Sequence, residues 1–143
     1  MIEKDIEYMA KAIEISKLSV DAANGKQVGC VIVRKNVIVG TGFRNLFVVK
    51  ETPYIDICFH AEHIALMEAG ENAEGGTMYV TMEPCKKRHQ GAWNKYAPPL
   101  NCSEMIIKAK IKRVVYLNMD KGEGGGGHEV LIQSGVEVNH IRI

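Results

Sequence analysis

The segment from Phe59 to Cys102 constrains this chain more than any other part of the sequence. It begins F-H-A-E-H, passes through E-P-C and ends P-P-L-N-C, so His60, Cys85 and Cys102 supply one imidazole and two thiols. Zinc accepts this donor set in proteins, and three protein ligands leave its fourth position for water. Glu62 follows the first ligand by two residues and is not needed as a ligand. We therefore expect a fold that gathers these three side chains around one zinc ion, with Glu62 beside it.

Other donors near this segment leave an alternative open. A zinc site that only stabilises the fold needs four protein ligands, and Cys58, His63 or His89 would then supply the fourth. Cys58 lies two residues before His60, but the start of the following helix should aim His60 rather than Cys58 inward. Because Glu62 is available as an acid–base group, the sequence favours a catalytic site over a structural one.

The composition is that of one globular domain. The 143 residues are 46% hydrophobic and 24% charged, which is ordinary for a folded domain. A net charge of +1 gives no overall attraction to nucleic acid or to an anionic membrane. No apolar run has the length of a membrane span, and the charged N-terminus lacks a signal-peptide core. We expect a single domain over residues 1–143 in the cytoplasm, with Cys30 as a buried thiol in a strand.

Hydrophobic periodicity predicts alternating helices and strands. Apolar residues recur at helical spacing in residues 2–22, which predicts an amphipathic helix. The β-branched runs 28–33 and 37–39 predict a hairpin that turns at residues 34–36. The further predicted helices are 60–69, 103–110 and 128–134, and the further strands are 77–82, 113–117 and 136–143.

The order of these elements predicts an α/β fold with a mixed five-stranded sheet flanked by helices. Because a helix separates each of the last strands from the next, the final three strands should run parallel. Residues 43–59 and 86–101 show no clear period and are predicted to be loops. A loop as long as the second one is usually functional in a compact domain.

The pattern H-x-E followed by P-C resembles the signature of zinc deaminases, although 16 residues rather than two separate Cys85 from Cys102. Further segments resemble the deaminase domain of the bifunctional deaminase-reductase (diaminohydroxyphosphoribosylaminopyrimidine deaminase) family of riboflavin biosynthesis. They are residues 8–17, 28–33, 60–85 and 98–107. The resemblance implies a three-layer cytidine deaminase-like fold, His60, Cys85 and Cys102 as ligands of one zinc ion, and Glu62 as the proton shuttle. It also implies a homodimer or homotetramer.

Three segments expected to contact substrate depart from this family. N-G-K-Q-V-G replaces the family's N-P-x-V-G before the first strand, and the loop from Arg44 to Phe59 is longer. Between the cysteines stands K-K-R-H-Q-G-A-W-N-K-Y-A, which replaces a His/Gly/Arg/Thr segment. The family's reductase domain is not expected in this chain.

Four residues in or beside these segments are candidate substrate-binding residues. Asn45 is a candidate to hydrogen-bond a ribose or base, as the asparagine after the second strand does in related deaminases. Lys86 and Arg88 suit a substrate phosphate, or they belong to a solvated loop. Trp93 either stacks on a ring or anchors the loop.

Together these features predict a hydrolytic deaminase that replaces an exocyclic ring amine by a carbonyl on an aminopyrimidine nucleotide. The best candidate substrate is the diaminopyrimidinone ribosylamino 5′-phosphate of riboflavin biosynthesis. Deoxycytidylate, another nucleoside or base, an antimetabolite and a single-stranded nucleic-acid base are the alternatives. A catalytically idle, zinc-folded binding subunit is the alternative from another class, and the presence of Glu62 argues against it.

Overall fold

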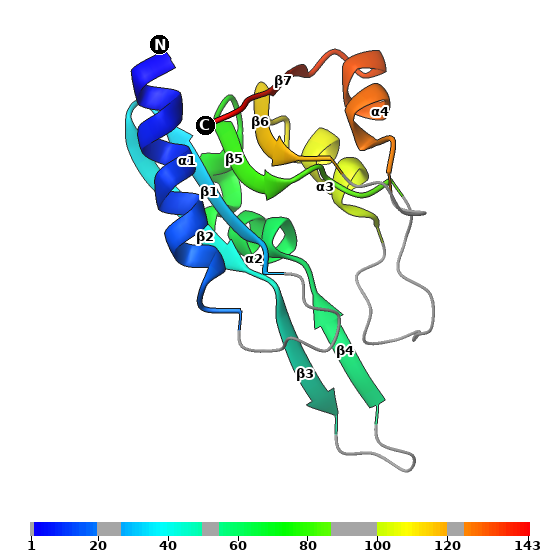
Figure 1. The fold of residues 1–143 in the computed structure, drawn as a ribbon. Helices are drawn as coiled ribbons and strands as arrows, with labels where there is room; N and C mark the ends of the chain where they lie inside the picture. Colours follow the sequence, from blue (N-terminus) through cyan, green and yellow to red (C-terminus); the bar gives the residue numbers. More distant parts are fainter. Residues whose placement is uncertain (1, 20–26, 50–54, 87–99, 120–124) are drawn as a thin grey trace.

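A mixed five-stranded sheet forms the middle layer of the computed structural model (Figure 1). Its strand order is β2-β1-β5-β6-β7. The strands are β1 (Gly29–Arg34), β2 (Val37–Phe43), β5 (Thr77–Met82), β6 (Arg113–Asn118) and β7 (Glu137–His140). β1 is antiparallel to β2 and β5, whereas β5, β6 and β7 are parallel. The predicted mixed sheet with parallel last strands is confirmed.

The structure describes the chain apart from residue 1 and residues 20–26, 50–54, 87–99 and 120–124. The predicted long loop between the cysteines therefore lies mostly outside the described residues. The same is true of the end predicted for the first helix.

Helices cover both faces of the sheet (Figure 1). α1 (Ile2–Ser16) lies on one face, and α2 (Ala61–Ala69), α3 (Cys102–Lys108) and α4 (Gly127–Gln133) lie on the other. Val31 and Tyr79 belong to the core under α1, while their neighbours Ile32 and Met78 belong to the core under α2 and α3. Successive side chains of a strand point to opposite faces, so a continuous apolar run marks a strand that is buried on both sides. The three predicted layers are confirmed.

The turn between β1 and β2 follows from two residues with left-handed backbone. Lys35 and Asn36 have φ angles of 53° and 62°. Two consecutive residues with positive φ form the two-residue turn that matches the twist of an antiparallel hairpin. The hairpin predicted around residues 34–36 is confirmed, and β2 extends four residues beyond its predicted end.

The prediction of a loop over residues 43–59 was wrong. This segment contains β3 (Asn45–Val49) and β4 (Ile55–Phe59), which pair antiparallel as a separate two-stranded sheet. Figure 1 shows this ribbon projecting from the end of β2 and leading back to the start of α2. Both strands are rich in β-branched and aromatic residues, which favour extended backbone.

Other boundaries differ from the prediction by a few residues. α1 ends at Ser16 instead of continuing to residue 22, and turn residues Lys17 and Leu18 follow it. β7 covers only residues 137–140 of the predicted strand 136–143. A short 3₁₀ helix, Gly70–Ala73, follows α2.

A buried ion pair ties α1 to the sheet. Both Arg113 Nη1 and Nη2 donate hydrogen bonds of 2.8 Å to the Asp5 carboxylate, and the Tyr79 hydroxyl donates a third, also of 2.8 Å. Hydrogen bonding by Arg113 is the main reason why the pKa of Asp5 is lower than its usual value, against the opposing effect of burial. This pair therefore links the first helix to β5 and β6 through a fully charged contact.

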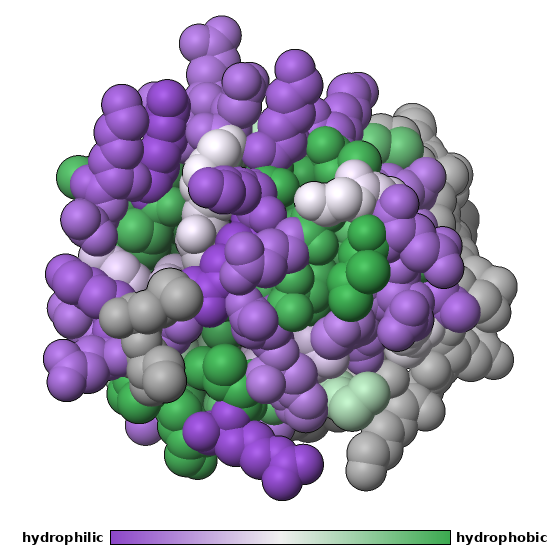
Figure 2. All heavy atoms as spheres, turned by 90° about the horizontal axis from the view of Figure 1, so that it is seen from above, coloured by the Kyte–Doolittle hydropathy of each residue, from purple (hydrophilic) through white to green (hydrophobic). Residues whose placement is uncertain are grey.

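The surface combines charged side chains with small patches of apolar side chains. Seen from above, apolar residues lie in patches between polar side chains (Figure 2). Large apolar side chains are exposed at Ile6, Leu18, Val37, Ile38, Met67, Met119, Ile132 and Ile143. Within the described part of the chain, no helix has the length and apolarity needed to cross a membrane.

Candidate metal and catalytic site

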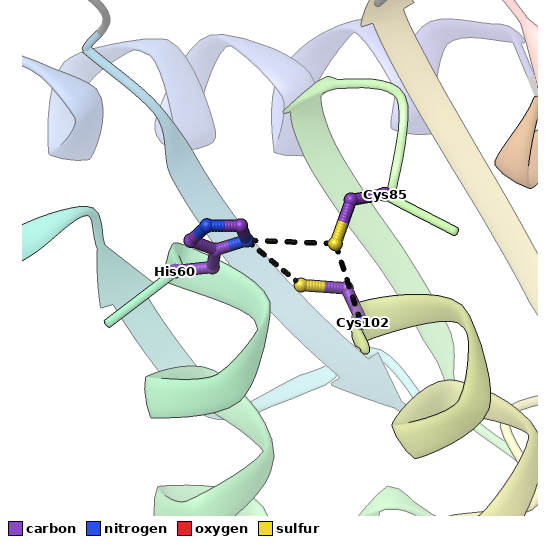
Figure 3. A group of neighbouring side chains, drawn as sticks. All are labelled: His60, Cys85 and Cys102. Atoms are coloured by element: carbon purple, nitrogen blue, oxygen red, sulfur yellow. Dashed lines mark hydrogen bonds between the residues drawn. The ribbon is translucent and has the colours of Figure 1, made fainter. Parts of the chain in front are cut away.

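His60, Cys85 and Cys102 come together from three separate segments (Figure 3). His60 is the N-cap of α2, Cys85 follows β5 after two intervening residues, and Cys102 is the first residue of α3. The His60 Nδ1 atom lies 3.1 Å from Cys102 Sγ and 3.7 Å from Cys85 Sγ. All three donor atoms lie within 4.8 Å of one another. The structure thus brings together the three side chains that the sequence predicted as ligands.

This donor set fits one zinc ion. Around a tetrahedral zinc with Zn–N and Zn–S distances of about 2.05 and 2.3 Å, a nitrogen and a sulfur ligand lie roughly 3.6 Å apart. The two observed nitrogen–sulfur distances bracket this value. The pKa of Cys85 is lowered to about 4. The hydrogen bond with Cys102 is the largest cause, and the hydrogen bond with His60 and its charge contribute less. Since zinc binds thiolates rather than thiols, Cys85 is already prepared for the ion.

Glu62 lies in the first turn of α2 and interacts with His60, Cys85 and Cys102. Its side chain is buried, and burial raises the pKa of its carboxyl group to about 7. The charges of His60 and Cys85 act on it in opposite directions, and the Cys102 side chain hydrogen-bonds to it. A carboxyl group with a pKa near neutrality can both accept and donate a proton under physiological conditions.

Two glycines of β2 let α2 approach the sheet closely enough to place His60 and Glu62. A Cβ atom on Gly40 would lie 2.4 Å from the carbonyl oxygen of Ala65, and one on Gly42 would lie 2.3 Å from that of Ala61. Both distances are shorter than any contact that a Cβ atom makes, so a side chain at either position would push the helix away.

The capping of α3 fixes the position of Cys102. The N-cap of α3 is Asn101. Asn101 Oδ1 accepts a 2.8 Å hydrogen bond from the Glu104 backbone N–H, and Glu104 Oε1 accepts one of 3.1 Å from the Asn101 N–H. This reciprocal pair is a capping box. Asn101 also donates a 2.7 Å bond to the carbonyl oxygen of Lys86, which ties α3 to the segment that carries Cys85.

The candidate substrate-binding residues are only partly described. Asn45 begins β3 and pairs with Phe59, the residue before His60, so it lies close to the metal ligands. Lys86 is exposed and follows Cys85. Arg88 and Trp93 lie outside the described residues, as do His89 and the side chain of Cys58.

His63 and Arg44 are two further residues beside the ligands. His63 Nδ1 lies 3.3 Å from Met105 Sδ, and the His63 ring packs 5.1 Å from that of Phe59, so this histidine contacts α3 and β4. Sequence reasoning missed Arg44, which precedes Asn45 in the chain and whose charge acts on His60. The pKa of His60 is higher than its usual value. Burial and the charge of Arg44 act to lower it, but the hydrogen bond with Cys85 and the charge of Glu62 outweigh them.

Comparison with known proteins agrees with this site. Residues 2–118 match the family model described as "Cytidine and deoxycytidylate deaminase zinc-binding region". The chain is 43% identical over 128 residues to the diaminohydroxyphosphoribosylamino-pyrimidine deaminase of Buchnera aphidicola, a match that covers 89% of this chain and 76% of that protein.

Solved structures give the same fold. RibD from Acinetobacter baumannii superimposes with a TM-score of 0.74 at 34% identity, covering 98% of this chain and 35% of that one. The dCMP deaminase of cyanophage S-TIM5 superimposes with a TM-score of 0.70 at 25% identity, covering 97% of this chain and 98% of that one. This chain therefore spans about a third of the RibD chain and nearly all of the phage enzyme.

Proposed function

The chain belongs to the family of zinc-binding cytidine and deoxycytidylate deaminases and is a hydrolytic deaminase, and on this premise we propose that it acts in riboflavin biosynthesis. The proposed substrate is the diaminopyrimidinone ribosylamino 5′-phosphate. The observation that carries this proposal is the 43% identity to the Buchnera diaminohydroxyphosphoribosylamino-pyrimidine deaminase, over 76% of that protein. The identity to the phage dCMP deaminase is much lower, at 25%.

The reaction exchanges an exocyclic amine for a carbonyl oxygen at one ring carbon. Water adds to that carbon, the bond from carbon to the amine nitrogen breaks, and ammonia leaves. Zinc held by His60, Cys85 and Cys102 would supply a Lewis acid that lowers the pKa of a bound water to about 7. Glu62 would take one proton from the attacking water and pass it to a ring nitrogen, and would then pass the second proton of that water to the departing amine. Its raised pKa, about 7, suits a group that must both gain and lose this proton.

The residues around the ligands would select the substrate. Asn45 lies beside His60 through its pairing with Phe59, which suits a hydrogen bond to a ribose or ring atom. Lys86 follows Cys85 and has an exposed side chain, which suits a substrate phosphate. We assign Arg88 and Trp93 to the same substrate-binding role on sequence grounds alone.

Deoxycytidylate is the second candidate substrate. The chain covers 98% of the phage dCMP deaminase with a TM-score of 0.70, so the two proteins share the deaminase fold over nearly their full lengths. Both candidate substrates are pyrimidine 5′-monophosphates that lose an exocyclic amine, and the same ligands and the same glutamate would serve either.

We also propose that residues 1–143 form one domain, that the protein works in the cytoplasm, and that it assembles as a homodimer or homotetramer. The resemblance to the deaminase family supports the assembly. The described part of the chain contains no helix that could cross a membrane, which is compatible with the location.

The deciding experiment is an assay of ammonia release by the zinc-loaded protein. The diaminopyrimidinone nucleotide, deoxycytidylate, cytidine, cytosine, guanine and a short single-stranded RNA would be compared at equal concentration. We expect turnover of the first compound at a kcat/KM at least about tenfold above every other, a difference of roughly 1.4 kcal/mol in transition-state stabilisation. Faster turnover of deoxycytidylate would replace the riboflavin assignment. No turnover of any compound by the zinc-loaded protein would favour an idle binding subunit.

A further inference from the structure

Glu83, two residues before Cys85, is a buried carboxylate that reaches α4. Only 3% of its surface is exposed, and its Oε2 atom accepts a 2.9 Å hydrogen bond from the backbone N–H of His128. The Glu83 backbone N–H donates a 2.7 Å bond to the carbonyl oxygen of Asn118. His128 Nδ1 in turn lies 2.7 Å from the hydroxyl group of Tyr116. Glu83 therefore joins the end of β5 to both β6 and α4.

The next residue in the chain, Pro84, lies directly against the first residue of α4. A Cβ atom on Gly127 would lie only 1.8 Å from the carbonyl oxygen of Pro84 and 2.8 Å from Ser103 Oγ. The backbone N–H and the hydroxyl group of Ser103 both donate to the carbonyl oxygen of Cys85, over 3.0 and 2.7 Å. The backbone around Cys85 is thus held between α3 on one side and α4 on the other.

The residue after Cys85 also contacts this helix. The Lys86 side chain crosses Gly126, where a Cβ atom would lie 3.0 Å from Nζ and 3.1 Å from Cδ. Gly126 has a φ angle of 101°, a conformation that side chains rarely adopt. Residues 126–128 therefore touch the chain immediately before and immediately after the ligand.

We propose that α4 is a working part of the zinc site, with Glu83 and Gly127 as positioning residues that aim the Cys85 sulfur at His60 and Cys102. Groups that orient metal ligands from outside typically contribute about 10–100-fold to metal affinity. Glu83 lies within the residues that the family model matches, whereas α4 begins at Gly127, after that match ends at residue 118. The inference rests on the zinc binding that the proposed function requires.

The test compares Glu83→Ala with Glu83→Gln in the full chain. Zinc affinity is measured by competition with a chromophoric chelator, and ligand geometry by the absorption spectrum of the cobalt-substituted protein. We expect Glu83→Ala to bind zinc about 10–100-fold more weakly with a shifted cobalt spectrum. Glu83→Gln should restore most of the affinity, because its amide oxygen can still accept the bond from His128. Glu129→Ala, a change at an exposed glutamate of the same helix, should match the unaltered protein.

A second pair of variants covers the case in which Glu83→Ala does not fold. Gly127→Ala should shift the cobalt spectrum, because its Cβ atom displaces Pro84. Gly29→Ala is the matched control, since its Cβ atom would lie 2.0 Å from the carbonyl oxygen of Ala12, on the α1 side of the sheet. It should lower the unfolding temperature and leave the spectrum unchanged.

Two results would overturn the inference. In the first, Glu83→Ala binds zinc as tightly as Glu83→Gln. In the second, the spectrum of Gly127→Ala equals that of Gly29→Ala. Failure of the unaltered protein to bind zinc would instead contradict the proposed function, so the two failures are distinguishable.

Discussion

The two faces of the sheet each bury a carboxylate, and the two carboxylates behave in opposite ways. Asp5, under α1, is 6% exposed, and Glu62, in α2, is 4% exposed. Two hydrogen bonds from Arg113 overcome the effect of burial on Asp5 and lower its pKa. Burial is the strongest influence on Glu62 and raises its pKa to about 7. Two carboxylates with similarly little exposed surface therefore have a lowered pKa on one face and a pKa near neutrality on the other.

The difference lies in the neighbours of each carboxylate. A guanidinium group keeps its charge at any pH that a protein experiences, so it fixes the charge of its partner and contributes to stability. Glu62 instead lies among an imidazole and two thiols, which themselves gain and lose protons. We infer that the α1 face is built to hold the fold together and the α2 face to carry out proton transfer, and the following changes test that division.

Removing a ligand should have the largest effect. Cys85→Ser and Cys102→Ser each replace a thiolate by a hydroxyl group that zinc binds poorly. Zinc affinity should therefore fall more than about 100-fold, a larger loss than the one expected for Glu83→Ala. Zinc content after dialysis against a chelator measures this. Cys30→Ala is the control, because Cys30 is a buried thiol of β1 outside the ligand group. One zinc ion per chain retained in either serine variant would show that the ligand set is wrong.

Replacing Glu62, the proposed proton carrier, should separate catalysis from metal binding. Glu62→Gln keeps the size of the side chain and removes its ability to take a proton, so kcat should fall by about 10²–10⁴-fold. The zinc content should stay at that of the unaltered protein. A Glu62→Gln protein with normal turnover would rule out the mechanism.

Breaking the charge pair on the α1 face should change stability and leave kcat close to its original value. Asp5→Asn leaves Arg113 with only the more exposed Glu137 as a counter-charge, and the free energy of unfolding should fall by roughly 2–4 kcal/mol at pH 7. Because the pKa of Asp5 is lower in the folded protein than its ordinary 3.8, its contribution is present above that pH. This contribution to stability disappears as the pH falls through the pKa that Asp5 has in the folded protein.

Urea unfolding at pH 7 and at about pH 3 would measure the difference in unfolding free energy between the unaltered protein and Asp5→Asn. This difference should be smaller at about pH 3. Glu137→Gln is the matched control, because Glu137 contacts the same arginine at 3.1 Å from a side chain that is 57% exposed. That change should cost less than about 1 kcal/mol. Equal losses of unfolding free energy in the two variants would mean that the Asp5–Arg113 pair stabilises the fold no more than the exposed Glu137–Arg113 pair does.

The chemistry of the site was predictable because it depends on the identity of the donor atoms. One imidazole, two thiols and a nearby glutamate specify a zinc site before any distance is known, and the fold brings the three donors within 4.8 Å. The parallel end of the sheet was predictable as well, since helical segments separate β5, β6 and β7 in the sequence.

What the sequence did not reveal depends on contacts between distant segments. Gly42 and Gly127 look like ordinary turn or loop glycines until Ala61 and Pro84 are placed against them. Asn101 caps α3 through its capping box with Glu104, and its bond to the carbonyl oxygen of Lys86 joins segments that the sequence does not place together. The β3–β4 ribbon was missed because its strands do not join the main sheet.

That ribbon has a consequence for how deaminases of this type can diversify. Its inner end is fixed by the pairing of Asn45 with Phe59, next to His60, and its outer end is the pair formed by Val49 and Ile55. Residues added or removed in equal numbers on both strands would change the reach of the ribbon without altering the register at its base. Selection for a new substrate could therefore act on the outer end of this ribbon while the catalytic centre is inherited unchanged.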